Sequence, residues 1–198
     1  MPLRNRKAAA ALAVAALAAV PLIASGSGPA IAAASAAPTW AIQPGGTLNS
    51  AVANGNDTIT VNFAKWGGTI QFDPDSPGAA AIHIDVDLTS AKIGDSFKDD
   101  LLQGDEFFGT ASTPMATYDS TSVEAQPDGR FVAHGNLKLH GMSMAQDVEF
   151  RLSGSGAQRH VEGSAVIDRL GYAIGTGSHG HDLGSAVTVN FAFDAKRS

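Results

Sequence analysis

The segment Lys98-Asp-Asp-Leu-Leu-Gln-Gly-Asp-Glu-Phe-Phe-Gly-Thr-Ala-Ser-Thr-Pro114 carries the one helical pattern that we find among the β-type patterns of this chain. Asp95 or Ser96 can cap the start of the helix, and Gly104 marks its end. Its apolar residues fall at helical spacing or just beyond the helix: Phe97, Leu101, Leu102, Phe107 and Phe108. One short helix with an apolar face between runs of strands predicts a lid or plug on a β-structure, or a connection that only completes the core.

Apolar and polar residues alternate on both sides of this segment, with the period of two that is typical of half-buried strands. Asn54-Gly55 predicts a tight hairpin because both residues tolerate positive φ, and Lys65-Trp-Gly-Gly68 is interpreted as a further turn. The pattern predicts about eight or nine short antiparallel strands. A sandwich remains open, but a barrel explains the single helix better, because a closed sheet has open ends that need covering and no edges to protect.

The first 37 residues have the features of a secretory signal peptide. Arg4, Arg6 and Lys7 precede the apolar run 8–24, and small residues up to Ala37 offer Ala-x-Ala-type cleavage sites. A retained membrane anchor is the alternative. We therefore expect a signal peptide at 1–37 and one domain at 38–198, exported to a bacterial periplasm and not membrane-spanning after signal removal.

The charge of the predicted mature domain limits its partners. Three of the 13 Lys and Arg residues and none of the 19 Asp and Glu residues lie in 1–37, which leaves ten basic against 19 acidic residues, a formal charge of −9. This charge argues against nucleic acid and anionic membrane surfaces as partners, and leaves an uncharged or hydrophobic ligand open.

Several motifs occur in an order that resembles a known family. They are Ile70-Gln-Phe-Asp-Pro74, Ile84-Asp-Val-Asp-Leu-Thr-Ser90, the helical segment, Gly135-Asn-Leu-Lys-Leu-His-Gly141 and Ile167-Asp-Arg-Leu-Gly-Tyr172. From Trp40 to the C-terminus the chain is similar to the YceI-like periplasmic proteins that bind polyisoprenoid lipids. It departs from their pattern at Lys98, where the family usually has Arg, and at the loop His179-Gly-His181-Asp182.

The resemblance implies an all-β fold, an eight-stranded antiparallel lipocalin-like barrel with one short capping helix. Its interior would hold an amphiphilic isoprenoid lipid, either an isoprenoid quinone or a polyprenyl chain, with no bond made or broken. A homodimer is implied as well. Small residues in the apolar rows, among them Ala133, Gly163, Ala165 and Ala192, are expected to leave room inside.

The lipid-tail site is expected among the apolar residues, each of which has plain core packing as its alternative. In the barrel rows the candidates are Phe63, Phe72, Ile84, Phe131, Phe150 and Phe191. At the mouth they are Phe97, Leu101, Leu102, Phe107, Phe108, Met142 and Met144. Tyr172 could pack a quinone ring or close the barrel end. Asp168 and Arg169 could contact a head group, although a structural clamp between strands is favoured.

His179, His181 and Asp182 form the one cluster with metal-like chemistry. Three ligand types on one glycine-rich loop are a weak signal, so we favour an exposed loop and predict no metal and no cofactor beyond the bound lipid. The chain has no cysteine and no Gly-x-Ser-x-Gly motif, which favours a protein that is not an enzyme. The alternative is a metal-dependent or stress-response protein acting through this loop, or an accessory to a membrane redox protein.

Overall fold

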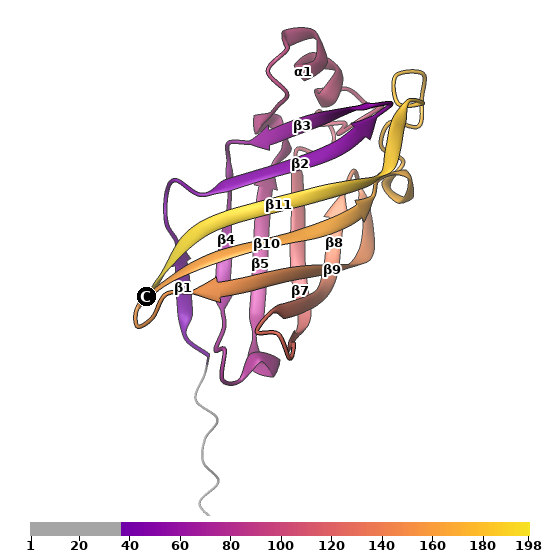
Figure 1. The fold of residues 1–198 in the computed structure, drawn as a ribbon. Coiled ribbons are helices and arrows are strands. Elements are labelled where there is room, and N and C mark those ends of the chain that lie inside the picture. Colours follow the sequence, from indigo (N-terminus) through magenta and orange to yellow (C-terminus); the bar gives the residue numbers. More distant parts are fainter. Residues whose placement is uncertain (1–36) are drawn as a thin grey trace, which may run out of the picture. The chain divides into compact units, whose positions relative to one another are not determined.

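The strands of this computed structural model, which describes residues 37–198, belong to one antiparallel sheet (Figure 1). The strands are β1 (Thr39–Ile42), β2 (Thr47–Asn54), β3 (Asp57–Phe63), β4 (Trp66–Gln71), β5 (Ala81–Asp87), β6 (Ala91–Lys92), β7 (Met115–Ala125), β8 (Phe131–Leu139), β9 (Met142–Ser153), β10 (Gln158–Asp168) and β11 (Leu183–Arg197). The helices in these residues are α1 (Ser96–Gln103) and the short 3-10 turns η1 (Pro77–Ala79), η2 (Leu88–Ser90) and η3 (Arg169–Tyr172). The predicted signal peptide lies, except for Ala37, outside the described residues.

The sheet closes on itself because β11 pairs with β1. Strands β1, β4, β5, β7, β8, β9, β10 and β11 follow one another in that order, and the register Trp40↔Arg197 joins the last to the first. This ring of eight strands confirms the predicted all-β barrel with one α-helix. The other part of the long strand β11 pairs with β2, β2 pairs with β3, and β3 pairs with β6. Helix α1 lies at the end of the barrel where β3 and β6 are found (Figure 1).

Two glycine-containing segments were predicted to be turns, and only the first of them is one. Gly55 has a φ of +60° in the tight β2–β3 connection, where Asn54 pairs with Asp57, as the Asn-Gly signal predicted. The segment 65–68 is not a turn: Trp66 begins β4 and pairs with Val86. Gly68 allows the close pairing of β4 with β5, because a Cβ at this position would lie 2.0 Å from the carbonyl oxygen of His83.

The core has two clusters of buried side chains, one at each end of the barrel. The cluster away from α1 is aromatic: Phe72 meets Phe131 and Phe150 edge-on, with ring centroids 5.1 and 5.6 Å apart. Trp40 Nε1 donates to the carbonyl of Phe72 at 2.8 Å, which satisfies the indole where it is buried. The second cluster includes Leu102 of α1 and Leu88, and it lies at the helix end of the barrel.

The wall between β9 and β10 is only partly hydrogen-bonded. The ladder runs from His160↔Ser153 to Ser164↔Glu149 and stops there. Beyond it the Nε2 of Gln146 donates to the carbonyl of Val166 at 3.1 Å. In this part of the wall, a hydrogen bond from a side-chain amide therefore connects β9 and β10 where the backbone ladder has ended.

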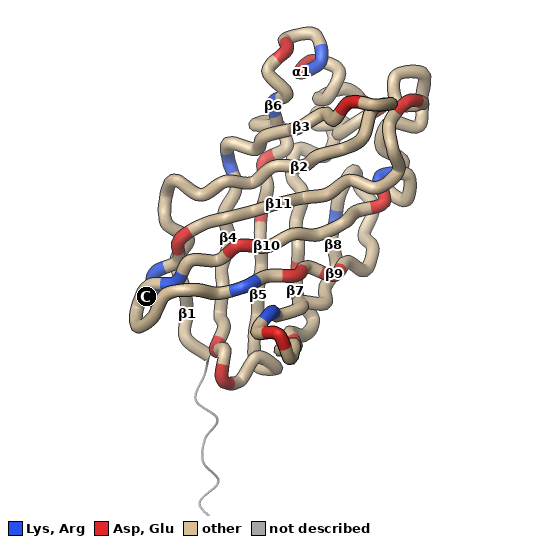
Figure 2. The backbone as a smooth tube through the Cα atoms, in the orientation of Figure 1, with Lys and Arg blue, Asp and Glu red and all other residues tan. Residues whose placement is uncertain are grey.

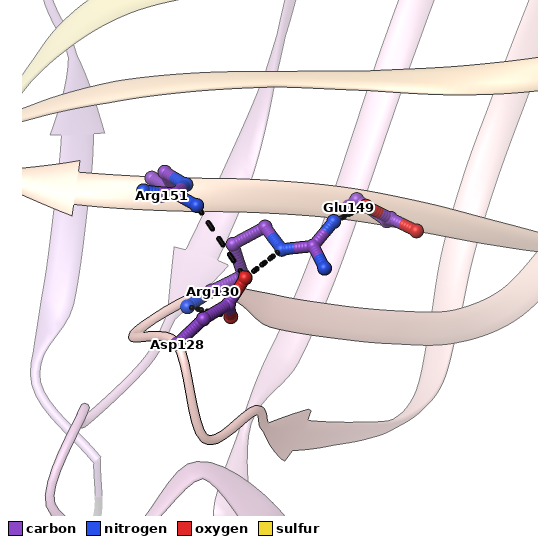
Figure 3. Close-up of polar contacts among 4 residues, drawn as sticks. All are labelled: Asp128, Arg130, Glu149 and Arg151. Carbon is purple, nitrogen blue, oxygen red and sulfur yellow. Dashed lines mark hydrogen bonds and ion pairs between the residues drawn. The ribbon is translucent and has the colours of Figure 1, made fainter.

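An exposed ion-pair network joins the β7–β8 turn to β9 (Figure 3). Arg130 contacts Asp128 and Glu149, and Arg151 Nη2 lies 3.4 Å from the same Asp128 carboxylate. The backbone N–H of Arg130 is the main cause that lowers the pKa of Asp128. Because these groups are exposed, we expect the network to orient the turn and to add little stability.

Two aspartates fix α1, and the sequence indicated the role of only one of them. Asp95 caps the helix, accepting from the N–H of Lys98 at 3.0 Å. Asp99 is buried and accepts from the N–H groups of Ile93 at 2.7 Å and Gly94 at 3.3 Å. Gly104 ends the helix as predicted, but with a φ of −71°, so its end needs no left-handed residue.

Acid should loosen this helix through Asp99. The N–H of Ile93 is the main cause that holds the pKa of Asp99 below its ordinary value of 3.8. The contribution of a carboxylate with a lowered pKa is complete above its unfolded value and is lost as pH falls through the folded one. We expect Asp99→Asn to lower the free energy of unfolding at neutral pH and to remove part of its decline below about pH 4.

Urea denaturation of the wild type and of this variant, at neutral pH and below about pH 4, measures the effect. Asp100→Asn is the matched control, since Asp100 is exposed on the same helix. A loss of stability that is equal in the two variants would contradict the role given to Asp99.

Candidate functional site

A first apolar cavity of about 190 Å³ lies inside the closed ring. It is lined from strands all around the barrel, including Trp40, Trp66, Phe72, Phe150, Phe191 and Phe193. The Tyr118 side chain also reaches it, but its hydroxyl donates to the carbonyl of Ala133 at 2.9 Å, and burial raises its pKa far above the ordinary value. The inner compartment therefore offers apolar surface and no free acid or base other than Arg159, which stacks over Trp40 near its end.

A second cavity of about 540 Å³ lies under α1. Its walls include α1, the η2–β6 segment, the β2–β3 hairpin and the loop that follows η3. Apolar side chains dominate it, and Phe97 is 68% exposed at its rim, so this compartment reaches the molecular surface. Its polar lining includes Lys98, Arg169, Ser178, His179 and His181.

The two compartments lie next to each other and share part of their lining, and we refer to them together as the channel. Five side chains line both of them: Leu48, Val86, Leu137, Ile167 and Val189. These residues come from five different strands and form an apolar waist between the two compartments. A flexible, apolar chain entering beside α1 would thus find apolar surface continuously from the rim to the aromatic end.

The structure brings most of the predicted tail residues to this channel. In the inner compartment they are Phe72, Ile84, Phe150 and Phe191, and in the outer compartment they are Phe63, Phe97, Leu101, Leu102, Phe107 and Phe108. Four predicted residues lie behind or outside these linings. Phe131 stacks on Phe150, Met142 packs against the cluster under α1, Met144 is 40% exposed, and Tyr172 is buried with its hydroxyl on the carbonyl of Leu137.

Only some of the small residues that were expected to leave room inside the barrel line a compartment. Ala133 and Ala165 line the inner compartment. The space above Gly163 is filled instead, because a Cβ there would lie 2.4 Å from Cζ of Phe191. Ala192 pairs with Glu162 and lines neither compartment. The aromatic ring uses the room that the glycine leaves, so Gly163 provides no space for a ligand.

Several lining residues were not singled out from the sequence, although the signal was present. Ile82 and Val86 belong to the same alternating row as Ile84, and Val189 to that of Phe191. Trp66 was missed because its two following glycines indicated a turn. Trp40 was missed because it lies in a strand of four residues, too short for a periodic pattern.

Arg169 is a structural clamp, and all of its N–H donors make hydrogen bonds within the protein. It is 6% exposed, and its five N–H donors go to five backbone carbonyls. The acceptors are Gly184 (2.8 Å from Nε), Ile174 and Gly175 (2.7 and 2.8 Å from Nη1), and Gly180 and Leu183 (2.8 and 2.7 Å from Nη2). Asp168 is exposed and caps η3 through the N–H of Leu170. Arg169 thus fixes the loop over the outer compartment, and Asp168 lies away from it.

The histidine loop is tied to the segment after α1. Glu106 accepts from the backbone N–H of His179 at 2.7 Å and lies 2.8 Å from its Nδ1, a contact that lowers the pKa of Glu106. His181 Nδ1 instead faces the carbonyl of Ser178 at 2.8 Å, and its Nε2 lies 3.2 Å from Asp182. Within residues 37–198, no three side chains of metal-binding type come together. The loop and the helical segment form one rim around the mouth.

A sequence model of the YceI-like domain matches residues 40–195 of the chain. The chain belongs to the YceI-like domain family. It is 32% identical over 95 residues to a UPF0312 protein of Yersinia pestis (strain Pestoides F), an alignment that covers 48% of this chain and 49% of that protein. A UPF0312 protein of Shewanella oneidensis is 28% identical over 102 residues, covering 52% and 53%. The chain thus spans about half the length of these curated relatives in the alignments.

Solved structures show the same fold. BcnA of Burkholderia cenocepacia superposes with a TM-score of 0.73 at 21% identity, covering 76% of this chain and 96% of that one. A polyisoprenoid binding domain from Saccharophagus degradans, implicated in plant cell wall breakdown, gives 0.63 at 17% identity, covering 80% and 98%. Within residues 37–198, no helix has the length and hydropathy needed to span a membrane.

Loss of the Arg169 clamp should be costly. We expect Arg169→Met to lower the free energy of unfolding by at least about 3 kcal/mol, because five carbonyls lose a charged donor in a buried place. Arg151→Met is the control: Arg151 is exposed, and its ion pair should contribute less than about 1 kcal/mol. Chemical denaturation followed by circular dichroism measures both, and an Arg169→Met variant as stable as the control would contradict the clamp.

Proposed function

We propose that this protein binds an amphiphilic isoprenoid lipid, with the chain inside the barrel, and carries or stores it without chemical change. The observation that carries the proposal is the pair of adjacent apolar compartments under α1, of about 540 and 190 Å³, which share an apolar waist. The likeness of the fold to the polyisoprenoid binding domain from Saccharophagus degradans supports the choice of ligand class.

The driving force is burial of the chain. Transfer of about 300 Å² of apolar surface at roughly 25 cal/mol per Å² contributes several kcal/mol before the costs of ordering the ligand. No specific polar contact is needed for this part of the affinity. The same reason explains why the binding residues form no short sequence motif.

A binding role is favoured over catalysis by what lines the inner compartment. Tyr118 has its hydroxyl engaged with the carbonyl of Ala133, and the remaining walls are almost wholly apolar. A ligand chain there would meet no positioned acid, base or nucleophile. We place the protein in the periplasm on the strength of the signal-like sequence at 1–37.

The proposal is tested by lipid uptake. The mature protein is incubated with membranes, repurified and extracted with organic solvent, and the extract is analysed by mass spectrometry. We expect a near-stoichiometric isoprenoid species. An extract without any such lipid, after incubation with membranes that contain quinones and polyprenyl lipids, would contradict the proposed function.

Charges in the wall of the outer compartment should abolish uptake. We expect Leu101→Asp and Phe107→Asp to retain less than about a tenth of the bound lipid, because each places an ionised group against the apolar chain. Met115→Asp is the matched control, since Met115 is 42% exposed and lines neither compartment. Circular dichroism verifies that the variants keep the β-fold, and normal uptake by Leu101→Asp and Phe107→Asp would contradict this route of entry.

A further inference from the structure

The barrel wall is weakly joined where the first half of β9 lies beside the second half of β10. Their ladder ends at Ser164↔Glu149, although β10 stays paired with β11, and β9 with β8, along the rest of both strands. We call the two facing stretches, 144–147 of β9 and 165–168 of β10, the seam. A stretch of wall without ladder hydrogen bonds costs less to open than its neighbours, so local opening is expected here.

The side chain of Gln146 bridges the seam. Its Nε2 donates to the carbonyl of Val166 at 3.1 Å and to that of Asp147 at 2.8 Å. Both strands carry charged positions (Figure 2), but within residues 37–198 no ion pair connects β9 with β10. A half-buried side chain can change rotamer while the backbone stays in place, so this hydrogen bond can act as a latch.

The seam is held at both ends and uncovered on its outer side. At one end is the ladder pair of Ser164, and at the other His140 Nδ1 lies 2.9 Å from the carbonyl of Tyr172, which ties the β8–β9 turn to η3. Between these anchors Met144 is 40% exposed and Val166 is 61% exposed, so among residues 37–198 no element covers them. The seam can therefore widen between its anchors without release of the surrounding ladders.

On its inner side the seam borders the waist. Gln146 and Ala165 line the inner compartment, and Ile167 lines both compartments as one of the five waist residues. Ile167 thus belongs both to the waist and to the part of β10 that lacks ladder partners on β9. A separation of β9 from β10 at this place changes the width of the waist.

We propose that the seam is a gate for the passage between the two compartments, with Gln146 as its latch. When Gln146 releases the carbonyl of Val166, β9 and β10 separate, Ile167 moves away from the waist, and the inner compartment becomes accessible. When the hydrogen bond forms again, the waist narrows. The gate is a property of the barrel wall, and only its use by a lipid chain rests on the proposed function.

The first test measures the gate without any lipid and uses the absence of cysteine in the chain. Ala165→Cys places a thiol in the inner compartment and Ile59→Cys one in the outer compartment, and the rate of reaction with N-ethylmaleimide is measured for each. Gln146→Met keeps the length of the side chain and removes its N–H donors. We expect it to raise the rate for Ala165→Cys about five-fold, the effect of losing one hydrogen bond, and to leave the rate for Ile59→Cys unchanged.

Gln158→Met is the matched control, because Gln158 is exposed on β10 and lines neither compartment. Circular dichroism verifies that each variant keeps the β-fold. An unchanged rate for Ala165→Cys in the Gln146→Met background would overturn the gate. A rise of the same size for Ile59→Cys would also overturn it, because the opening would then not be confined to the seam.

The second test asks whether a lipid chain uses the gate. Binding of geranylgeraniol to the wild type and to Gln146→Met is followed by stopped-flow tryptophan fluorescence. Lost or gained contacts with a bound ligand change mainly the dissociation rate, so the association rate constant is the quantity that reports on a gate. We expect Gln146→Met to raise it several-fold. An unchanged association rate constant would overturn the use of the gate by the lipid, whereas binding to neither protein would refute the proposed function and leave the thiol result standing.

Discussion

The hydrogen-bonded ladder between β1 and β11 is the constraint on which the other features depend. It turns an open sheet into a ring, and the length of β11 lets it pair with β1 at one end and with β2 at the other. The ring places the inward side chains of every strand around one axis. Without this closure the residues of the waist, such as Leu48 and Val189, would belong to an open sheet face and would enclose nothing.

Polar contacts, several of them buried, organise the end of the barrel where α1 lies. Asp99 fixes the approach to α1, and Arg169 gathers the carbonyls of the loop opposite. Glu106 and His179 then join the two sides of the rim. The channel therefore has an aromatic closed end and a polar, hydrogen-bonded mouth, the arrangement that an amphiphile requires.

Alternation along the strands was sufficient to predict the antiparallel sheet and the lining residues Phe63, Phe72, Phe150 and Phe191. The preference for a barrel over a sandwich came from the single helix, and the hairpin was predicted from Asn54-Gly55. It could not distinguish Phe131, which backs the wall, from Phe150, which lines it, because the difference is one of neighbours across strands. The carbonyl contacts of Arg169 and the burial of Asp99 could not be predicted from the sequence for a related reason. Their partners are backbone groups, whose positions depend on the folded path of the chain and leave no pattern of side chains in the sequence.

The central claim is that a lipid chain occupies both compartments through the waist. The most direct measurement is an isotope-filtered NOE spectrum of the ¹³C-labelled protein with an unlabelled polyprenyl ligand. The account predicts contacts from the ligand to Leu101 in the outer compartment, to Val189 at the waist and to Val148 in the inner compartment. Contacts only on the outer surface of the barrel, with the inner methyl groups unchanged by the ligand, would contradict it.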